Sequence, residues 1–336
     1  MNLIIPMAGR GSRLRPHTLT VPKPLVPVAG KPIVQRLAED LTASLSEKVD
    51  KIAFVIGDFG DEVEQQLLDI AKGLGAEGVV VEQDKPLGTA HAILCAQELL
   101  EGPTMIAFAD TLFTADFNFD VNDNDGIIWA QRVDDPSAFG VLKLDDEGFI
   151  TDFVEKPTEF VSDLAIVGIY YVRDGAALKR EMQYLIDNDI KDKGEYQLTN
   201  ALEALKAKGT KFRPGTVEEW LDCGNKVAVV HTHQRVLELK ADSEQLVSDT
   251  ATVENSVVLE PCYLGPGARI TNSVVGPHVS VGANSVVEGS VVRNSIIQDD
   301  TTVTQANLAD SMLGNHASYV GEASDISAGD YSAIRQ

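Results

Sequence analysis

The feature that most restricts the fold is a repeat of short apolar units beyond residue 250. Apolar residues recur every six positions and then again 17 residues further on, in the series Val258, Leu264, Ile270, Val275, Val281, Val287, Val292, Val303, Leu308 and Leu313. A run of ordinary hairpins would alternate with period two. Hexads rich in Val, Ile and Gly are instead typical of a β-helical solenoid, in which each hexad forms one side of a triangular coil.

Residues 1–109 show a different pattern, in which apolar runs of strand length alternate with helix-like segments. We expect strands at residues 3–5, 51–56, 79–81 and 105–109, and helices at residues 32–41, 61–71 and 89–100. This order, with near-continuous apolar strands, predicts a parallel sheet covered by helices on both faces. Ligands bind such sheets outside the carboxyl ends of the strands, where the loop after residue 5, Gln83 and Asp110 all fall.

From residue 126 onward the pattern changes to paired strands, followed by helices. Strands are expected at 127–133, 140–144, 150–154, 166–172 and near 212, and helices at 175–188, 198–208 and 226–240. The long helix ends where the hexads are about to begin. We therefore predict two domains, a catalytic one over residues 1–240 and a β-helix over residues 241–336.

Composition limits the partners of the chain. Among its 336 residues, 51 are acidic and 28 are Lys or Arg, which gives a formal net charge of -23. Such a charge repels nucleic-acid backbones and anionic membranes, so we expect neither as a partner. Three scattered cysteines make neither a disulfide framework nor a zinc motif, and no signal peptide or membrane-span pattern is present, so we expect a cytoplasmic protein.

The segment that follows the first strand is a candidate phosphate site. Residues 7–16 contain Gly9 and Gly11, and glycine lets backbone amides approach an anion closely. Arg13 and Lys23 offer positive charge to the same anion, which matters in a chain so acidic overall. Arg10 and Arg15 are also basic, but either could lie on the surface.

Five segments together resemble the sugar-1-phosphate nucleotidylyltransferases, the family that includes glucose-1-phosphate thymidylyltransferase. They are the loop at 7–28, Pro86-Leu87-Gly88-Thr89-Ala90, Asp110, Val154-Glu155-Lys156-Pro157 and Trp220-Leu221-Asp222-Cys223-Gly224-Asn225. The resemblance covers about residues 1–240, and several members carry a hexad tail. It implies a Rossmann-like, GT-A-like mixed sheet followed by a left-handed parallel β-helix, and an α/β fold class overall.

The resemblance also implies a reaction, because members of the family join a nucleoside triphosphate to a sugar 1-phosphate and release pyrophosphate. The protein must position two mutually repelling anions and neutralise the charge that develops on pyrophosphate. Mg²⁺ is the implied cofactor, with Asp110 and Asp222 as its ligands, since this hard ion prefers carboxylate oxygens. The catalytic residues implied are Arg13, Lys23, Asp110, Lys156 and Asp222.

The binding residues follow from the same matched positions. Those expected to bind nucleotide are Ala8, Gly9, Gly11, Ser12, Gln83, Gly88 and Thr89. Those expected to bind the sugar phosphate are Gly140, Glu155, Lys156, Gly168 and Tyr170. The Gln83 amide can accept from N3–H and donate to O4 of uracil or thymine, which favours UTP or dTTP, although guanine shows the same pattern and a flipped amide could serve adenine.

Other functions stay open at this stage. The chain could be a mannose-1-phosphate guanylyltransferase or a paralogue that binds a sugar nucleotide without turnover, although a non-catalytic copy has no physical need for both metal carboxylates. A tail with acetyltransferase activity would need a base with a partner and a pocket, and His278 and His316 are the candidates. Both occupy hexad positions typical of scaffold residues. We expect the β-helix to mediate self-association, giving a homo-oligomer.

Overall fold

The computed structural model describes residues 1–9, 11–115, 117, 119, 123–322, 327, 329 and 331, so Arg10 lies outside the described residues. The chain forms two compact units. The first comprises residues 1–26 and 31–228, and the second comprises residues 27–30 and 229–336. Our assignment of residues 1–240 as the catalytic domain stays a prediction.

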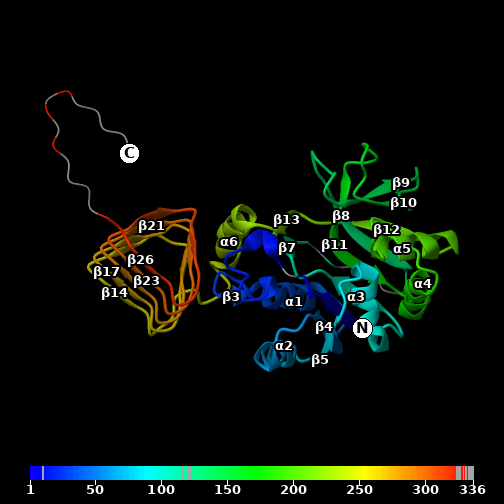
Figure 1. The fold of residues 1–336 in the computed structure, drawn as a ribbon, viewed down its shortest axis with the longest axis horizontal. Coiled ribbons are helices and arrows are strands. Elements are labelled where there is room, and N and C mark those ends of the chain that lie inside the picture. Colours follow the sequence, from blue (N-terminus) through cyan, green and yellow to red (C-terminus); the bar gives the residue numbers. More distant parts are fainter. Residues whose placement is uncertain are drawn as a thin grey trace. The chain divides into compact units, whose positions relative to one another are not determined.

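The first unit is built on a mixed β-sheet (Figure 1). Its strands are β1 (Asn2–Pro6), β4 (Lys51–Ile56), β5 (Glu77–Glu82), β6 (Thr104–Ala107), β8 (Gly126–Arg132), β9 (Gly140–Leu144), β10 (Ile150–Glu155), β11 (Leu164–Val172) and β12 (Phe212–Thr216). The main strand order is β10-β9-β11-β6-β1-β4-β5, with β8 beside β11 and β12 beside β8. Short strands β3 (Lys31–Pro32), β7 (Thr111–Thr114) and β13 (Glu219–Asp222) lie outside this sheet.

The prediction of parallel strands is correct for β1, β4, β5 and β6. Leu3, Ile4 and Ile5 of β1 are fully buried, and successive side chains on a strand point to opposite faces, so both faces of the sheet are covered. β11 then pairs with β6 in the antiparallel sense, and β9 and β10 continue in that sense. The sheet is therefore mixed, as the family resemblance implies.

Helices lie between many of these strands in the chain, and several of them pack on the sheet. They are α1 (Ile33–Ser44), α2 (Asp61–Gly73), α3 (Thr89–Cys95), α4 (Gly175–Asp187), α5 (Leu198–Ala207) and α6 (Lys226–Lys240), with short 3₁₀ turns η1 (Ser12–Leu14), η2 (Lys23–Leu25) and η3 (Gln97–Leu99). The α4 helix begins at a cap, since the Asp174 carboxylate accepts from the Ala177 amide at 2.8 Å. Within the described residues no helix is long and apolar enough to cross a membrane.

The predicted helix over residues 89–100 is partly wrong, because α3 ends at Cys95. The chain then tightens into η3, where the Leu99 amide donates to the Ala96 carbonyl. This tighter turn lets both Leu99 and Leu100 enter the core, with exposed fractions of 5% and 0%. Core packing therefore overrides the continuous helical pattern at this point.

The second unit contains the predicted β-helix, visible in Figure 1 as the stack of coils coloured from yellow to red. Its strands are β14 (Thr252–Glu254), β15 (Val257–Val258), β16 (Cys262–Leu264), β17 (Arg269–Thr271), β18 (Val274–Val275), β19 (Val279–Val281), β20 (Val286–Glu288), β21 (Val291–Arg293), β22 (Ser295–Ile297), β23 (Thr302–Thr304), β24 (Asn307–Ala309), β25 (Met312–Leu313) and β26 (Ser318–Val320); β2 (Pro27–Val28) also belongs to this unit. Over residues 252–320 they form three parallel ladders, β14-β17-β20-β23-β26, β15-β18-β21-β24 and β16-β19-β22-β25. The hexad residues meet inside the coils, so the predicted left-handed β-helix is confirmed.

The repeat weakens in the later coils because one corner becomes a residue shorter. Val275 pairs with Val292 and Val279 pairs with Ser295, so the connection from the second ladder to the third loses one residue. Corners of the coils use left-handed backbone, for example at Asn272 with φ 51°. Asparagine tolerates this conformation better than most residues, which explains why it stands before serine at Asn255-Ser256, Asn272-Ser273 and Asn294-Ser295.

Candidate active site

The loop after β1 forms one wall of a cavity of about 370 Å³. The Met7 amide donates to the Val55 carbonyl at 2.8 Å, which anchors the start of the loop to β4. Gly11 has φ 60°, and a Cβ atom there would lie 2.6 Å from the Lys23 Cβ. A side chain at position 11 would therefore push Lys23 away, and the glycine lets loop and lysine pack together.

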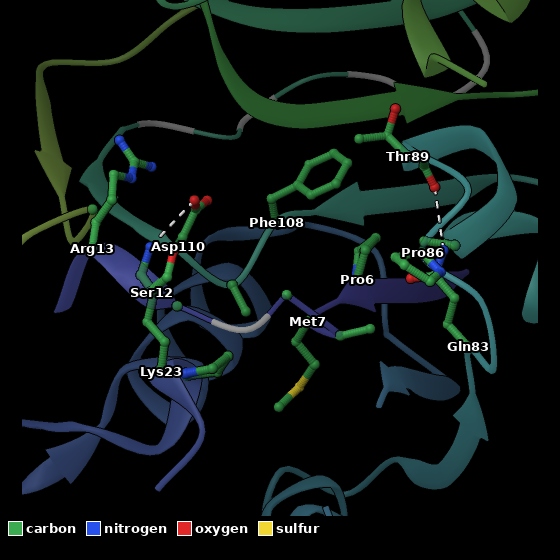
Figure 2. A pocket seen from close by; sticks show the side chains of 18 of the residues that line it. Pro6, Met7, Ser12, Arg13, Lys23, Gln83, Pro86, Thr89, Phe108 and Asp110 are labelled. Atoms are coloured by element: carbon green, nitrogen blue, oxygen red, sulfur yellow. Dashed lines mark hydrogen bonds and ion pairs between the residues drawn. The ribbon is translucent and has the colours of Figure 1, made fainter. Parts of the chain in front are cut away.

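The predicted nucleotide residues and part of the predicted catalytic set line this one cavity. The lining includes Ala8, Gly9, Gly11, Ser12, Arg13, Lys23, Gln83, Gly88, Thr89 and Asp110. Figure 2 shows Arg13, Lys23 and Asp110 on one side of the cavity, opposite Gln83 and Thr89. The charged end of the cavity therefore holds Arg13, Lys23 and Asp110, and the opposite end offers the neutral polar groups of Gln83 and Thr89 together with Glu195, which lies beside Gly88.

Lys23 and Asp110 form an ion pair at the charged end. The Lys23 Nζ lies 3.3 Å from the Asp110 Oδ2, and the lysine side chain is only 8% exposed against 52% for the aspartate. Asp110 therefore holds the Lys23 ammonium in place at the wall of the cavity, where it could donate to a phosphate. Arg13 is exposed and adds a second cation at the same end.

Asp222 reaches this end from far along the chain. β13 pairs with β7 so that Asp222 stands opposite Thr111, and the Cys223 amide donates to the Asp110 carbonyl at 3.0 Å. Burial raises the pKa of Asp222, and the neighbouring Asp110 charge raises it further, whereas Lys23, Arg13 and the Gly224 amide act in the opposite direction. Two carboxylates and two cations therefore lie within electrostatic reach of one another.

The carboxylates of Asp110 and Asp222 suit a magnesium ion in their chemistry. Hard oxygen donors are what Mg²⁺ prefers, and this ion is usually held by one or two carboxylates together with water and substrate phosphates. The raised pKa of Asp222 indicates a partly desolvated carboxylate that a cation would stabilise. In the part of the chain that the structure describes, no group of three or more His, Cys, Asp or Glu side chains could hold a metal without such outside ligands.

The opposite end of the cavity is formed by Gln83, Gly88 and Thr89. Gln83 follows β5 and is fixed by its backbone amide, which donates to the Ile56 carbonyl at 2.7 Å. Gly88 has φ 119° and opens α3, and a Cβ there would lie 2.5 Å from the Tyr196 carbonyl oxygen. Thr89 Oγ1 donates to Gln197 Oε1 at 3.1 Å and accepts from the Leu198 amide at 2.9 Å.

The predicted sugar-phosphate residues lie on β9, β10 and β11. Gly140 stands opposite Glu155 in the β9–β10 register, and a Cβ at Gly140 would lie 3.2 Å from Glu155 Oε2. Lys156 Nζ lies 3.6 Å from Glu155 Oε1 and is half exposed. Glu155 is mostly buried and accepts from Thr199 Oγ1 at 3.4 Å. The absence of a side chain at Gly140 thus leaves space beside the Glu155 carboxylate, which is paired with the half-exposed Lys156 ammonium.

Gly168 and Tyr170 connect these strands with the cavity. Gly168 has φ 101°, within the stretch of β11 where the register against β8 shifts, and its carbonyl accepts from the Phe108 amide at 3.0 Å. Burial raises the pKa of Tyr170, and the charges of Glu155 and Asp110 raise it further. Both carboxylates therefore act electrostatically on one buried phenol, which lies within reach of both groups of predicted residues.

Several residues of the site are marked only weakly in the sequence. Glu195 and Phe108 line the cavity, Gln197 holds Thr89, and Thr199 holds Glu155. The stretch from Glu195 to Thr199 is buried apart from its first residue, although it contains polar side chains ahead of a helix. Buried polar residues need partners, so this stretch was a usable but weak signal.

A comparison with known families places this cavity in context. The nucleotidyl transferase family matches residues 3–238 of the chain. The Haloferax volcanii protein Agl11, a low-salt glycan biosynthesis nucleotidyltransferase, is 32% identical over 97% of this chain and 95% of its own length. A glucose-1-phosphate thymidylyltransferase of Streptomyces griseus is 30% identical over 99% of this chain and 98% of its own length. The chain therefore belongs to the nucleotidyl transferase family, and within it to the sugar-1-phosphate nucleotidyltransferases.

More distant similarities agree with the fold. The bifunctional protein GlmU of Methanococcus vannielii is 27% identical over 95% of this chain and 79% of its own length. A solved structure of apo UDP-glucose pyrophosphorylase aligns with a TM-score of 0.58 at 24% identity, covering 71% of this chain and 98% of that one. The predicted family, fold class and enzyme class are confirmed, whereas the roles of single site residues stay predictions.

Proposed function

We propose that this chain transfers a nucleotidyl group from a nucleoside triphosphate, preferably dTTP or UTP, to glucose 1-phosphate or another hexose 1-phosphate. The products are an NDP-sugar and pyrophosphate. One observation carries the proposal: a single cavity has Arg13, Lys23 and Asp110 at one end and Gln83 at the other. A nucleotide needs both kinds of end, because its triphosphate is anionic and its base is recognised by hydrogen bonds.

The proposed chemistry asks the protein mainly to position two anions. A phosphate oxygen of the sugar 1-phosphate attacks the α-phosphorus, the bond from the α-phosphorus to the bridging oxygen breaks, and pyrophosphate leaves. Lys23, Arg13 and the amides near Gly9 and Gly11 hold the triphosphate, and Lys156 holds the sugar phosphate. Holding both anions in line against their repulsion is the main catalytic contribution in such reactions.

Asp110 and Asp222 would hold Mg²⁺, and the bound ion would neutralise part of the negative charge on the phosphates. Both carboxylates would lie at the charged end, because the pairing of β13 with β7 brings Asp222 next to Asp110. Glu155 would accept hydrogen bonds from sugar hydroxyls above Gly140. Gly168 and Tyr170 would complete the sugar pocket, and Ala8, Ser12, Gly88 and Thr89 would complete the nucleotide pocket.

A substrate panel tests this function directly. Purified protein with Mg²⁺ is offered ATP, CTP, GTP, UTP or dTTP together with the 1-phosphates of glucose, mannose, galactose or N-acetylglucosamine. We expect pyrophosphate release to be fastest with UTP or dTTP and glucose 1-phosphate. A preference for GTP with mannose 1-phosphate would favour the guanylyltransferase alternative, and no release with any pair would leave only the non-catalytic paralogue.

The proposed metal ligand Asp110 is tested by Asp110→Asn. We expect turnover to fall about a hundredfold or more, because loss of a carboxylate weakens the metal site, while nucleotide binding partly survives. Asp69→Asn is the matched control, since this carboxylate lies exposed on α2 and accepts from Gln65 at 3.2 Å. Full activity of the Asp110 variant would remove this residue from the proposed metal site.

We also propose that copies of this chain associate through the β-helix. Val257, Val274 and Val291 stack in register on β15, β18 and β21, and they are 52%, 37% and 47% exposed. A straight ladder of identical side chains can cover itself around a two-fold axis. Light scattering should therefore find a larger native mass for the wild type than for Val274→Glu, and equal masses would count against this surface. The cytoplasmic location stays a prediction.

A further inference from the structure

Gln83 has a neighbour on α3 that the nucleotide pocket does not explain. The Gln83 Nε2 lies 3.0 Å from the Nδ1 of His91, and it also lies 3.3 Å from the carbonyl oxygen of Gly88. The second contact is the dashed line between the labels Thr89 and Pro86 in Figure 2. Gln83 itself lines the cavity, whereas His91 stands behind it on the third residue of α3.

The Gly88 carbonyl decides which way the Gln83 amide faces. A carbonyl oxygen can only accept a hydrogen bond, so the group directed at it must be the amide nitrogen and not the amide oxygen. Turning the amide over would bring two acceptor oxygens together. The Gly88 carbonyl is in turn fixed, because it also accepts from the Ala92 amide of α3 at 3.1 Å.

This orientation also fixes the tautomer of His91. The amide nitrogen carries two hydrogens, and its second hydrogen points to the His91 Nδ1, which must then accept. A neutral imidazole accepts at one nitrogen and donates at the other, so the His91 proton resides on Nε2. Both hydrogens of Gln83 are therefore taken by protein acceptors, and Oε1 is the polar atom of this amide that remains for a ligand.

We propose that His91 is a positioning residue that locks Gln83 as a pure hydrogen-bond acceptor toward the nucleotide base. The proposal rests on the function proposed above and deepens it by naming the class of base. Uracil, thymine and guanine present a ring N–H that such an acceptor can bind. Cytosine and adenine present a ring nitrogen lone pair at the corresponding position, which an acceptor repels. Gln83 then does not donate to O4, unlike the two-way contact that its side chain alone would allow.

Two variants at position 91 separate this role from ordinary packing. His91→Phe keeps a flat ring but cannot accept, whereas His91→Asn keeps an acceptor at the position of Nδ1. The readout is the ratio of kcat/KM for UTP to kcat/KM for CTP, since these two nucleotides differ only at the base edge. We expect His91→Phe to lower this ratio about fivefold, the effect of losing one ordinary hydrogen bond, and His91→Asn to restore it to within about twofold.

A purely structural role would give a different result, because weaker packing lowers the rates with UTP and CTP alike and leaves their ratio unchanged. An unchanged ratio in His91→Phe, or an equally low ratio in His91→Asn, would overturn the proposal. The rise in Tm caused by UDP compared with CDP gives the same comparison without turnover, and His91→Leu replaces His91→Phe if that variant folds poorly. A wild type that releases no pyrophosphate but still prefers UDP would refute the proposed function and leave the role of His91 standing.

Discussion

The charged residues of the cavity are held close together although they repel one another in part. Asp222 has a raised pKa because of burial and because Asp110 is near, and the cations Lys23 and Arg13 only partly offset this. Such an arrangement is unfavourable for the empty fold. The same arrangement favours binding of a cation and a phosphate, because the cation neutralises the carboxylates and the phosphate neutralises Lys23 and Arg13.

Asp222→Asn should reveal this conflict as a dependence of stability on pH. Since the pKa of Asp222 is raised, the folded state binds its proton more tightly than the unfolded state, so this stability is present below about pH 4 and is lost as pH rises through the folded pKa. Asparagine does not ionise and can still accept from the Gly224 amide, which lies 2.9 Å from Asp222 Oδ1. The Tm of the variant should match that of wild type in acid and exceed it at neutral pH, while turnover falls about a hundredfold.

The thermal melts for this variant need no substrate and can be run from acid to neutral pH. If the Tm of the variant instead fell below that of wild type as the pH rises, the Asp222 carboxylate would be stabilised more by its cationic neighbours than it is destabilised by burial, and the predicted conflict would be wrong. Asp69→Asn serves as the control here too, because its carboxylate lies on α2 and is not part of the cluster formed by Asp110, Asp222, Lys23 and Arg13.

Gly88 is the residue whose backbone most depends on the absence of a side chain. Gly88→Ala would place a Cβ 2.5 Å from the Tyr196 carbonyl oxygen and 2.7 Å from its amide nitrogen, at φ 119°. We expect the free energy of unfolding to fall by about 2–3 kcal/mol, measured by urea denaturation, because strain and collision act together. Gly73→Ala in α2 has open space around its Cβ and should be neutral or stabilising by up to about 1 kcal/mol.

At the scale of elements, the β-helix is held together by side-chain ladders as well as by its strands. The Ser256 Oγ accepts from the Ser273 amide, the Ser273 Oγ from the Ser290 amide, and the Ser290 Oγ from the Ala306 amide, each at 3.0 Å. These bonds run from coil to coil at one corner. They satisfy amides that would otherwise be buried without a partner.

Ser273→Ala should test this ladder within the full-length protein. Ser273 is 4% exposed and also donates to the Thr271 carbonyl at 2.8 Å, so its loss leaves the Ser290 amide without its acceptor. We expect the free energy of unfolding to fall by about 1–3 kcal/mol in urea denaturation. Ser318→Ala on the exposed strand β26 should change it by less than about 0.5 kcal/mol, and equal effects of both changes would contradict the ladder.

His278 and His316 illustrate how corners of the β-helix are built. Both have left-handed backbone, with φ 61° and 56°, at corners where other coils carry Asn or Asp. His278 Nε2 lies 2.9 Å from Glu238 Oε1 on α6, so this imidazole is engaged with the helix of its own unit. These positions agree with the scaffold role inferred from the hexads.

At the scale of the whole molecule, the net charge of -23 is the dominant electrostatic feature. Like charges repel more strongly in the compact state than in the unfolded chain, and salt screens this repulsion. We therefore expect Tm at pH 7.5 to rise by about 3 °C when NaCl is raised to about 0.5 M. Near the sequence pI of about 4.5 the same salt should raise Tm much less, and an equal rise at both pH values would exclude self-repulsion as the cause.

How much of this protein its sequence predicts depends on the range of the interactions involved. Local periodicity predicts the hexads, the parallel strands β1, β4, β5 and β6, and most helices, because burial of one face repeats at a fixed spacing. It fails at the end of α3, where two leucines turn into the core, and at the shortened corner of the β-helix. Both exceptions are set by packing between coils or layers, which no local window contains.

The sequence by itself determined the two kinds of architecture in this chain and the chemistry available to it, since spacing and residue type need no partner. Only the tertiary structure decided which groups meet. Asp222 reaches Asp110 because β13 pairs with β7. Both amide hydrogens of Gln83 are engaged in hydrogen bonds, because the start of α3 brings the Gly88 carbonyl and His91 close to this amide. Whether a side chain acts as donor or acceptor depends on its neighbours in space, and chain folding alone supplies those neighbours.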